Sequence, residues 1–96
     1  MAPIITYYPT AKRASLRPSC GEWWVWLERP GEPVEACVFT REDVGDAIGD
    51  SQFSNQEAVT AWVEGRLKGA GYLTTSMDPP LGTGGFIASW ALAPAK

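Results

Sequence analysis

Histidine is absent from the 96 residues, and cysteine occurs only twice, at Cys20 and Cys37. The absence of histidine excludes Ser-His-Asp and Cys-His catalytic arrangements, in which an imidazole is the base. Two cysteines give too few soft ligands for a closed zinc site. They can form a disulfide only if their Cα atoms come within about 7 Å. We predict two reduced, half-buried thiols, with a disulfide as the alternative, and neither a metal nor a cofactor.

Long hydrophobic runs are also absent. No apolar run approaches the ~20 residues that span a bilayer, and the N-terminus lacks the apolar core of a secretory signal. We therefore expect a cytoplasmic protein that makes no membrane contact. A chain of 96 residues is long enough for one hydrophobic core but not for two, which predicts a single domain over residues 1–96.

Positive charge is scarce in the middle of the chain. Residues 22–64 contain ten acidic side chains and two arginines, a local net charge of −8, whereas the first 21 residues contain Lys12, Arg13 and Arg17 and no acid. The whole chain carries a net charge of −3. Because lysine and arginine supply most of the affinity for nucleic acid by neutralising phosphates, this balance argues against a general nucleic-acid binder.

Residues 53–72 form the one segment whose start, periodicity and end all predict an amphipathic helix. Ser54 and Glu57 have the spacing of a capping box, and Gly69 or Gly71 can end the helix. At 100° per residue, five apolar side chains share one face: Val59, Trp62, Val63, Leu67 and Ala70. One face of this helix is therefore expected to be buried.

The other apolar segments predict an antiparallel sheet. Strand-like composition marks residues 3–8, 22–29, 33–40, 72–77 and 86–92. Residues 10–21, rich in serine, proline and basic side chains, predict a linker. Thr40 and Asp43 repeat the capping pattern and predict a short helix over residues 41–48. This order predicts an α+β fold: a two-layer antiparallel sheet of four to five strands with one long amphipathic helix packed on one face.

The pairing of residues 22–29 with residues 33–40 decides which side chains are exposed. Placing Leu27 opposite Val34 gives one wholly apolar face for the helix. The other face then carries Trp24, Trp26 and Phe39. Because one helix covers one face, we expect this aromatic face to be an exposed binding surface. The alternatives are that the N-terminal strand or residues 78–85 cover it, or that it closes a homodimer.

The composition of this face points to a non-catalytic protein-binding module with Trp24, Trp26 and Phe39 as anchors. Acidic side chains around them suit a partner with a basic surface; those expected to contact the partner are Glu28, Glu35, Glu42, Asp43, Asp46 and Asp50. In size, charge and lack of catalytic motifs, the chain resembles small phage-encoded inhibitors of host machinery, anti-CRISPR proteins among them. Some of those inhibitors occupy basic nucleic-acid channels, so the resemblance implies a viral protein whose partner can be a nucleoprotein complex.

Two other classes stay open. A single-stranded nucleic-acid binder would stack bases on the aromatic face and hold phosphates with the basic N-terminal arm of Lys12, Arg13 and Arg17. An enzyme would need a carboxylate pair, for which the sheet offers Glu22, Glu28 and Glu35. Nothing in the sequence brings a nucleophile, a base and an oxyanion donor together, so we expect no enzymatic activity.

Overall fold

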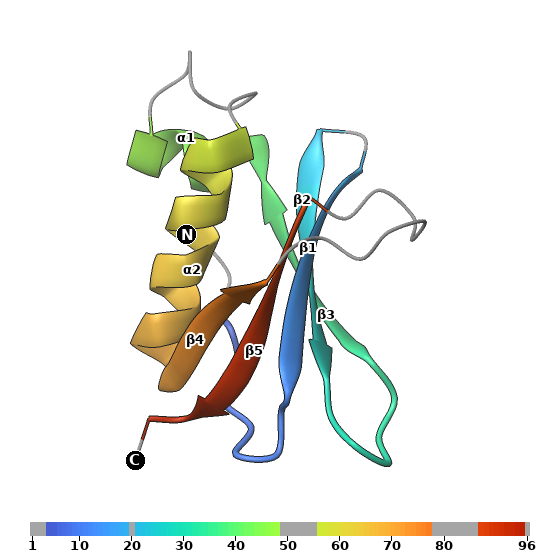
Figure 1. Ribbon diagram of the computed structural model, residues 1–96. Coiled ribbons are helices and arrows are strands. Elements are labelled where there is room, and N and C mark those ends of the chain that lie inside the picture. Colours follow the sequence, from blue (N-terminus) through green and yellow to red (C-terminus); the bar gives the residue numbers. More distant parts are fainter. Residues whose placement is uncertain (1–3, 20, 49–55, 78–86, 96) are drawn as a thin grey trace.

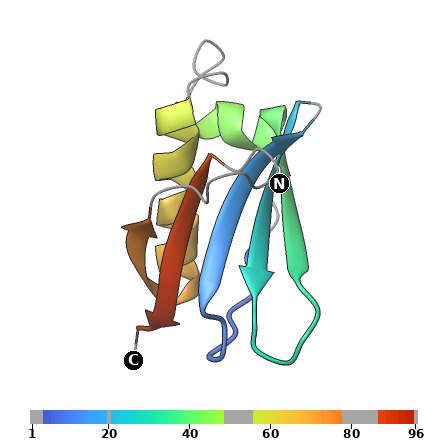
Figure 2. The ribbon, with the colours of Figure 1, turned by 45° about the vertical axis from the view of Figure 1, so that its right-hand side comes forward.

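The computed structural model describes residues 4–19, 21–48, 56–77 and 87–95. Within these ranges the chain forms five strands and two helices: β1 (Arg13–Ser19), β2 (Glu22–Glu28), β3 (Glu35–Thr40), α1 (Arg41–Ile48), α2 (Gln56–Ala70), β4 (Tyr72–Met77) and β5 (Ala88–Pro94). The strands make one sheet in the order β3-β2-β1-β5-β4, with every neighbouring pair antiparallel. Both helices lie on the same side of the sheet (Figures 1 and 2). The predicted α+β fold is confirmed.

The first twenty residues differ from the prediction. Residues 4–8, predicted as part of a strand, form none, whereas residues 13–19, predicted as a linker, form β1 at the centre of the sheet. Ala14 and Leu16 are fully buried and Arg17 is exposed. Only two apolar side chains therefore give this strand its inward face, which is too few for a clear alternating pattern.

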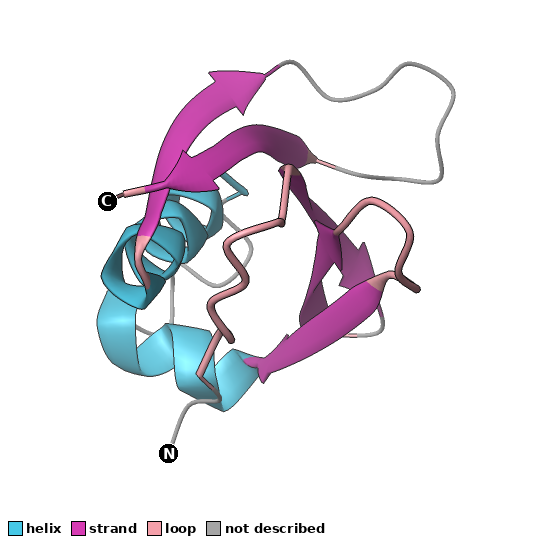
Figure 3. Cartoon of the chain, turned by 90° about the horizontal axis from the view of Figure 1, so that it is seen from below, coloured by secondary structure: helices cyan, strands magenta, loops and turns pink. Residues whose placement is uncertain are grey.

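The N-terminal segment, residues 4–12, lies on the helix side of the sheet (Figure 3). Ile5 belongs to the buried core. The Tyr72 hydroxyl donates a hydrogen bond to the backbone oxygen of Thr6 at 2.8 Å and accepts one from the amide of Tyr8 at 2.7 Å. This segment therefore does not cover the opposite face, and that alternative is wrong.

These tyrosines make stability sensitive to alkaline pH. Burial raises the pKa of Tyr72, and a hydrogen bond to Glu35 raises the pKa of Tyr8. A group whose pKa is higher in the folded state stabilises the protein fully below its unfolded pKa, and loses this contribution as pH rises through the folded pKa. The free energy of unfolding should therefore fall above about pH 10, the ordinary tyrosine pKa.

Urea unfolding at about pH 8 and about pH 10.5, on the natural chain and on Tyr72→Phe, tests this expectation. The variant loses two hydrogen bonds, so it should be less stable at the lower pH by about 1–3 kcal/mol. It should then lose less stability than the natural chain when the pH is raised. An equal loss in both proteins would show that Tyr72 does not contribute to the alkaline decrease.

The hydrophobic core lies between the sheet and α2. Alternate side chains of the strands face the helices, and the buried ones include Leu16, Val25, Leu27, Trp90 and Leu92. From α2 they meet Val59, Val63 and Leu67, which are fully buried, as the helical periodicity predicts. The expected cap at Ser54 lies outside the described residues.

The end of α2 is fixed by Gly71. This residue has φ +116°, and a Cβ at this position would lie 3.0 Å from the Tyr7 ring. Both the backbone angle and the close approach of the ring favour glycine. The helix therefore ends at the second of the two predicted positions, and the chain turns directly into β4.

Candidate functional site

The pairing of β2 with β3 differs by one residue from the prediction. Leu27 pairs with Glu35, and Trp23 pairs with Phe39. Phe39 consequently faces the helices, is fully buried, and packs edge-to-face on Trp62 with ring centroids 4.9 Å apart. The predicted exposure of Phe39 is wrong, because a shift of one residue moves every side chain of a strand to the opposite face.

This register is favoured because it gives the Glu35 carboxylate a hydrogen-bond partner. The half-buried carboxylate of Glu35 accepts a hydrogen bond from the Tyr8 hydroxyl at 2.5 Å. Arg29 lies over the same tyrosine, with its guanidinium carbon 4.1 Å from the ring centroid. The free-energy cost of burying a carboxylate is far lower when the carboxylate is hydrogen-bonded, as Glu35 is at the start of this edge strand, than when it is unpaired. Glu35 therefore lies on the opposite side of the sheet from Trp24 and Trp26.

The face of the sheet opposite the helices brings together side chains that the sequence separates. β1 and β2 are neighbours, and Arg17 pairs with Trp24. Arg13, Arg17, Trp24 and Trp26 all point to this face by the alternation of the two strands, and we call these four residues the Trp–Arg face. Arg17 is exposed, whereas both tryptophans are half-buried. Arg13 and Arg17 of the predicted basic arm are thus part of the sheet, beside the aromatic side chains, whereas Lys12 precedes β1.

A small hollow of about 120 Å³ lies on the Trp–Arg face, lined by Arg17, Ser19, Trp24 and Trp26. The indole nitrogen Nε1 of Trp24 is shielded from solvent and has no hydrogen-bond partner among the described residues. Leaving a buried donor unpaired costs about 1–3 kcal/mol. An acceptor atom of a ligand that reached this nitrogen would remove that cost. Ser19 was not among the predicted site residues.

A larger hollow of about 450 Å³ lies at the other end of the β1–β2 pair. We call it the cationic hollow, and the residues that line it include Lys12, Arg13, Glu28, Arg29, Pro30 and Ala91. Nε of Arg13 lies 3.8 Å from Oε2 of Glu28 and donates a hydrogen bond to Oγ of Ser89 at 3.1 Å. Arg29 is a further residue that the sequence did not single out.

Of the four predicted acidic contacts whose side chains the structure describes, Glu28 alone shares the face of the tryptophans. Glu42 and Asp43 are on α1, in the helix layer. The Asp43 carboxylate accepts a hydrogen bond from the Thr40 amide at 2.9 Å, and the Thr40 hydroxyl accepts one from the Asp43 amide at 3.2 Å, which is the predicted capping arrangement. Asp50 and the side chain of Asp46 lie outside the described residues.

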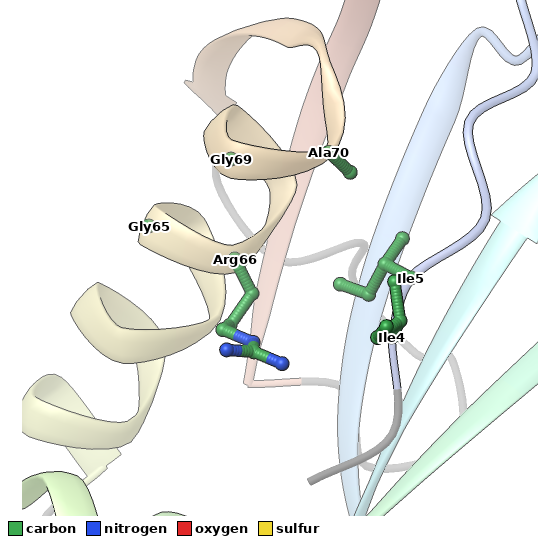
Figure 4. Close-up of a pocket in the computed structure, with 6 residues that line it drawn as sticks. All are labelled: Ile4, Ile5, Gly65, Arg66, Gly69 and Ala70. Atoms are coloured by element: carbon green, nitrogen blue, oxygen red, sulfur yellow. The ribbon is translucent and has the colours of Figure 1, made fainter.

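A third hollow, of about 270 Å³, lies in the helix layer between α2 and the N-terminal segment (Figure 4). Arg66 extends from α2 into this space, and Ile4 and Ile5 lie across from it. The guanidinium carbon of Arg66 is 5.5 Å from the Trp62 ring centroid, a cation–π contact. Among the described residues of the lining, Arg66 is the only charged one, so they offer few groups that would orient a polar ligand.

Neither metal chemistry nor a membrane span is indicated in the described part of the chain. No group of three or more His, Cys, Asp or Glu side chains there could hold a metal ion. No helix there is both long and apolar enough to cross a bilayer.

Cys37 is a free, half-buried thiol whose pKa is raised, mainly by burial. Cys20 lies outside the described residues.

The chain was compared with protein-family models, with curated proteins and with solved structures, and none of the three comparisons found a match. The function is therefore inferred from the Trp–Arg face and the two hollows beside it.

Proposed function

We propose that the protein is a non-catalytic domain that binds single-stranded nucleic acid on the Trp–Arg face. The observation that carries this proposal is the position of Arg17 and Arg13 beside Trp24 and Trp26 on two neighbouring strands, on the side of the sheet without helices. Aromatic side chains on a sheet stack on unpaired bases, and arginine holds the phosphates between them. Stacking tolerates any sequence, because every base has a π face.

The acidic net charge opposes this proposal less than the sequence suggests. The two central strands place Arg13 and Arg17 against Glu22 and Glu28 on the open face, so this part of the face is neutral. Lys12 adds a positive charge at one end, whereas the guanidinium of Arg29 lies over Tyr8, on the helix side of the sheet. Local potential rather than net charge determines where a polyanion docks.

A titration with a twelve-nucleotide oligothymidylate, followed by intrinsic tryptophan fluorescence, tests the proposal. We expect saturable quenching. The logarithm of the binding constant should fall with the logarithm of salt concentration by about 0.7 for each phosphate contacted. A duplex should bind more weakly, because its bases are already stacked. No quenching at low salt, with this oligonucleotide or with one of mixed sequence, would refute the proposal.

A protein-binding inhibitor of the phage type is the second candidate. It is supported by a different observation: the first turn of α1 carries Glu42 and Asp43, and Glu28 lies on the same face as the tryptophans. Such a protein would present these acids to a basic partner surface. The negative charge of Glu28 would weaken binding of a nucleic acid and strengthen binding of a basic protein partner.

Glu28→Gln separates the two candidates. The variant removes one negative charge from the open face and releases Arg13, whose Nε is 3.8 Å from Glu28. Binding of the oligothymidylate should tighten by roughly two- to five-fold, the effect of one exposed charge pair of about 0.5–1 kcal/mol. A protein partner with a basic surface would instead bind more weakly.

The matched control is Glu57→Gln, the same charge change at an exposed position of α2. It should leave the affinity for the oligothymidylate nearly unchanged at moderate salt, because charges beyond a Debye length are screened. Weaker oligonucleotide binding by Glu28→Gln than by the control would contradict the nucleic-acid proposal.

A further inference from the structure

The cationic hollow concentrates positive charge in a protein that is acidic overall. Three of its lining residues, Lys12, Arg13 and Arg29, are cations and one, Glu28, is an anion. The described residues of the lining therefore carry a net charge of +2, against −3 for the whole chain. A concave site lined by one sign of charge focuses the electrostatic field and raises the local concentration of the opposite ion.

The cations of this hollow are not saturated by partners within the described residues. Arg13 has Glu28 and Ser89 as neighbours. Nε of Arg29 is shielded from solvent and has no hydrogen-bond partner there, and its guanidinium carbon lies over the Tyr8 ring. Buried guanidinium nitrogens are normally hydrogen-bonded. Because this nitrogen is shielded from solvent, an acceptor can reach it only if the Arg29 side chain moves off the Tyr8 ring.

The backbone around the hollow is held in place by hydrogen bonds. The amide of Lys12 donates to the Glu28 carbonyl at 2.9 Å, which fixes the start of β1 against the end of β2. The amide of Glu32 donates to the Arg29 carbonyl at 3.1 Å, and Gly31 adopts φ +77° in the same turn. The backbone positions of Lys12 and Arg29 are therefore set before any ligand arrives, so binding needs to order only their side chains.

We infer that the cationic hollow is a phosphate-binding site that holds a backbone phosphate of the bound strand. This inference rests on the proposed function. Lys12, Arg13 and Arg29 together present more N–H donors than one carboxylate accepts, and arginine matches phosphate geometry with its planar fork. Arg17 is four residues after Arg13 along β1, a distance of about 13 Å. The nucleic-acid strand therefore runs along the β1–β2 pair, from the hollow toward Ser19.

The first arm of the test uses inorganic pyrophosphate without nucleic acid. The side-chain Nε signals of Arg13, Arg17 and Arg29 are followed in nitrogen-15 NMR spectra at constant ionic strength. We expect saturable shifts of Arg13 and Arg29 and a smaller shift of Arg17, which lies at the other end of β1. Equal shifts of all three signals, or none, would overturn the inference.

The second arm measures the salt dependence of oligothymidylate binding for Lys12→Gln. The variant should reduce the slope of log K against log[salt] by about 0.7, because one phosphate contact is lost. Lys68→Gln is the matched control. It also removes one lysine charge, but from an exposed position on α2, where Lys68 pairs with Glu64 at 3.2 Å. This control should leave the slope unchanged.

Arg29→Lys supplies the third arm, because it keeps the charge but removes the planar fork. It should leave the salt slope near that of the natural chain and weaken the pyrophosphate-induced shift of Arg13. Thermal melts accompany this variant, since Arg29 packs on Tyr8. A pyrophosphate response identical to that of the natural chain, in a folded variant, would remove Arg29 from the site.

Failure of the inference and failure of the proposed function give different results. Oligothymidylate binding in which Lys12→Gln behaves like Lys68→Gln would overturn the phosphate site and leave the Trp–Arg face as the binding surface. Saturable pyrophosphate shifts without any tryptophan quenching by oligothymidylate would confirm an anion site and overturn its assignment to a nucleic-acid strand.

Discussion

Trp24→Ala is expected to weaken oligothymidylate binding by roughly 5- to 150-fold, since loss of base–aromatic stacking costs about 1–3 kcal/mol per base. Trp24 is half-buried on the open face, and its neighbour across the strands is Arg17. The variant removes the stacking surface and widens the small hollow that both residues line. Because tryptophan itself is replaced, the affinity is best measured by fluorescence anisotropy of a labelled oligonucleotide.

Two further variants make this result specific to stacking. Trp24→Phe keeps an aromatic face and should recover much of the lost affinity, although it lacks the unpaired Nε1 donor. Leu73→Ala removes an apolar side chain that is 58% exposed on the same face of the sheet, but on the edge strand β4, which β1 and β5 separate from β2. This variant should bind like the natural chain. Equal affinities of Trp24→Ala and Leu73→Ala would refute the stacking role.

Trp90→Ala is expected to lower the free energy of unfolding by about 3–5 kcal/mol, the usual cost of truncating a buried aromatic side chain. Trp90 is fully buried on β5, where it pairs with Ala14 on one side and Ser76 on the other. Alanine leaves a cavity between the sheet and α2. Small domains have only about 5–15 kcal/mol of stability, so this single change removes a large share.

Urea unfolding of Trp90→Ala measures this loss, and Trp24→Ala provides a control with the same chemical change on the opposite face of the sheet. Trp24 is only half-buried, so its truncation should cost clearly less than that of Trp90. The slope of unfolding free energy against urea concentration should be similar in both, because it follows the surface exposed on unfolding. Equal stability losses would contradict the assignment of Trp90 to the core.

The helices were predictable from sequence because each carries several local signals. The periodic apolar positions Val59, Val63 and Leu67 are all buried, and Thr40 with Asp43 forms the expected cap. β1 was not predictable in the same way. Residues 13–19 form a strand because they hydrogen-bond to β2 on one side and to β5 on the other. β5 is distant in sequence, so this pairing cannot be inferred from the local composition of residues 13–19.

The candidate site was predictable only in part, for a similar reason. Trp24 and Trp26 lie on the open face as expected, since the alternation within β2 is local. Phe39 was misplaced because the register depends on Glu35, whose hydrogen-bond partner Tyr8 is 27 residues away in sequence. Arg29 had no distinguishing neighbours in the sequence, and its unpaired nitrogen becomes visible only once β1 and the turn after β2 are in place.

The central position of β1 also has a consequence for the order of folding. Arg13 pairs with Glu28 across a short hairpin, but on its other side it pairs with Ala91 of β5. The sheet is therefore complete only after β5 has been synthesised. Contacts between distant residues form slowly, because loop closure costs entropy first. Until β5 arrives, β1 is an edge strand whose unpaired backbone groups can pair with another chain.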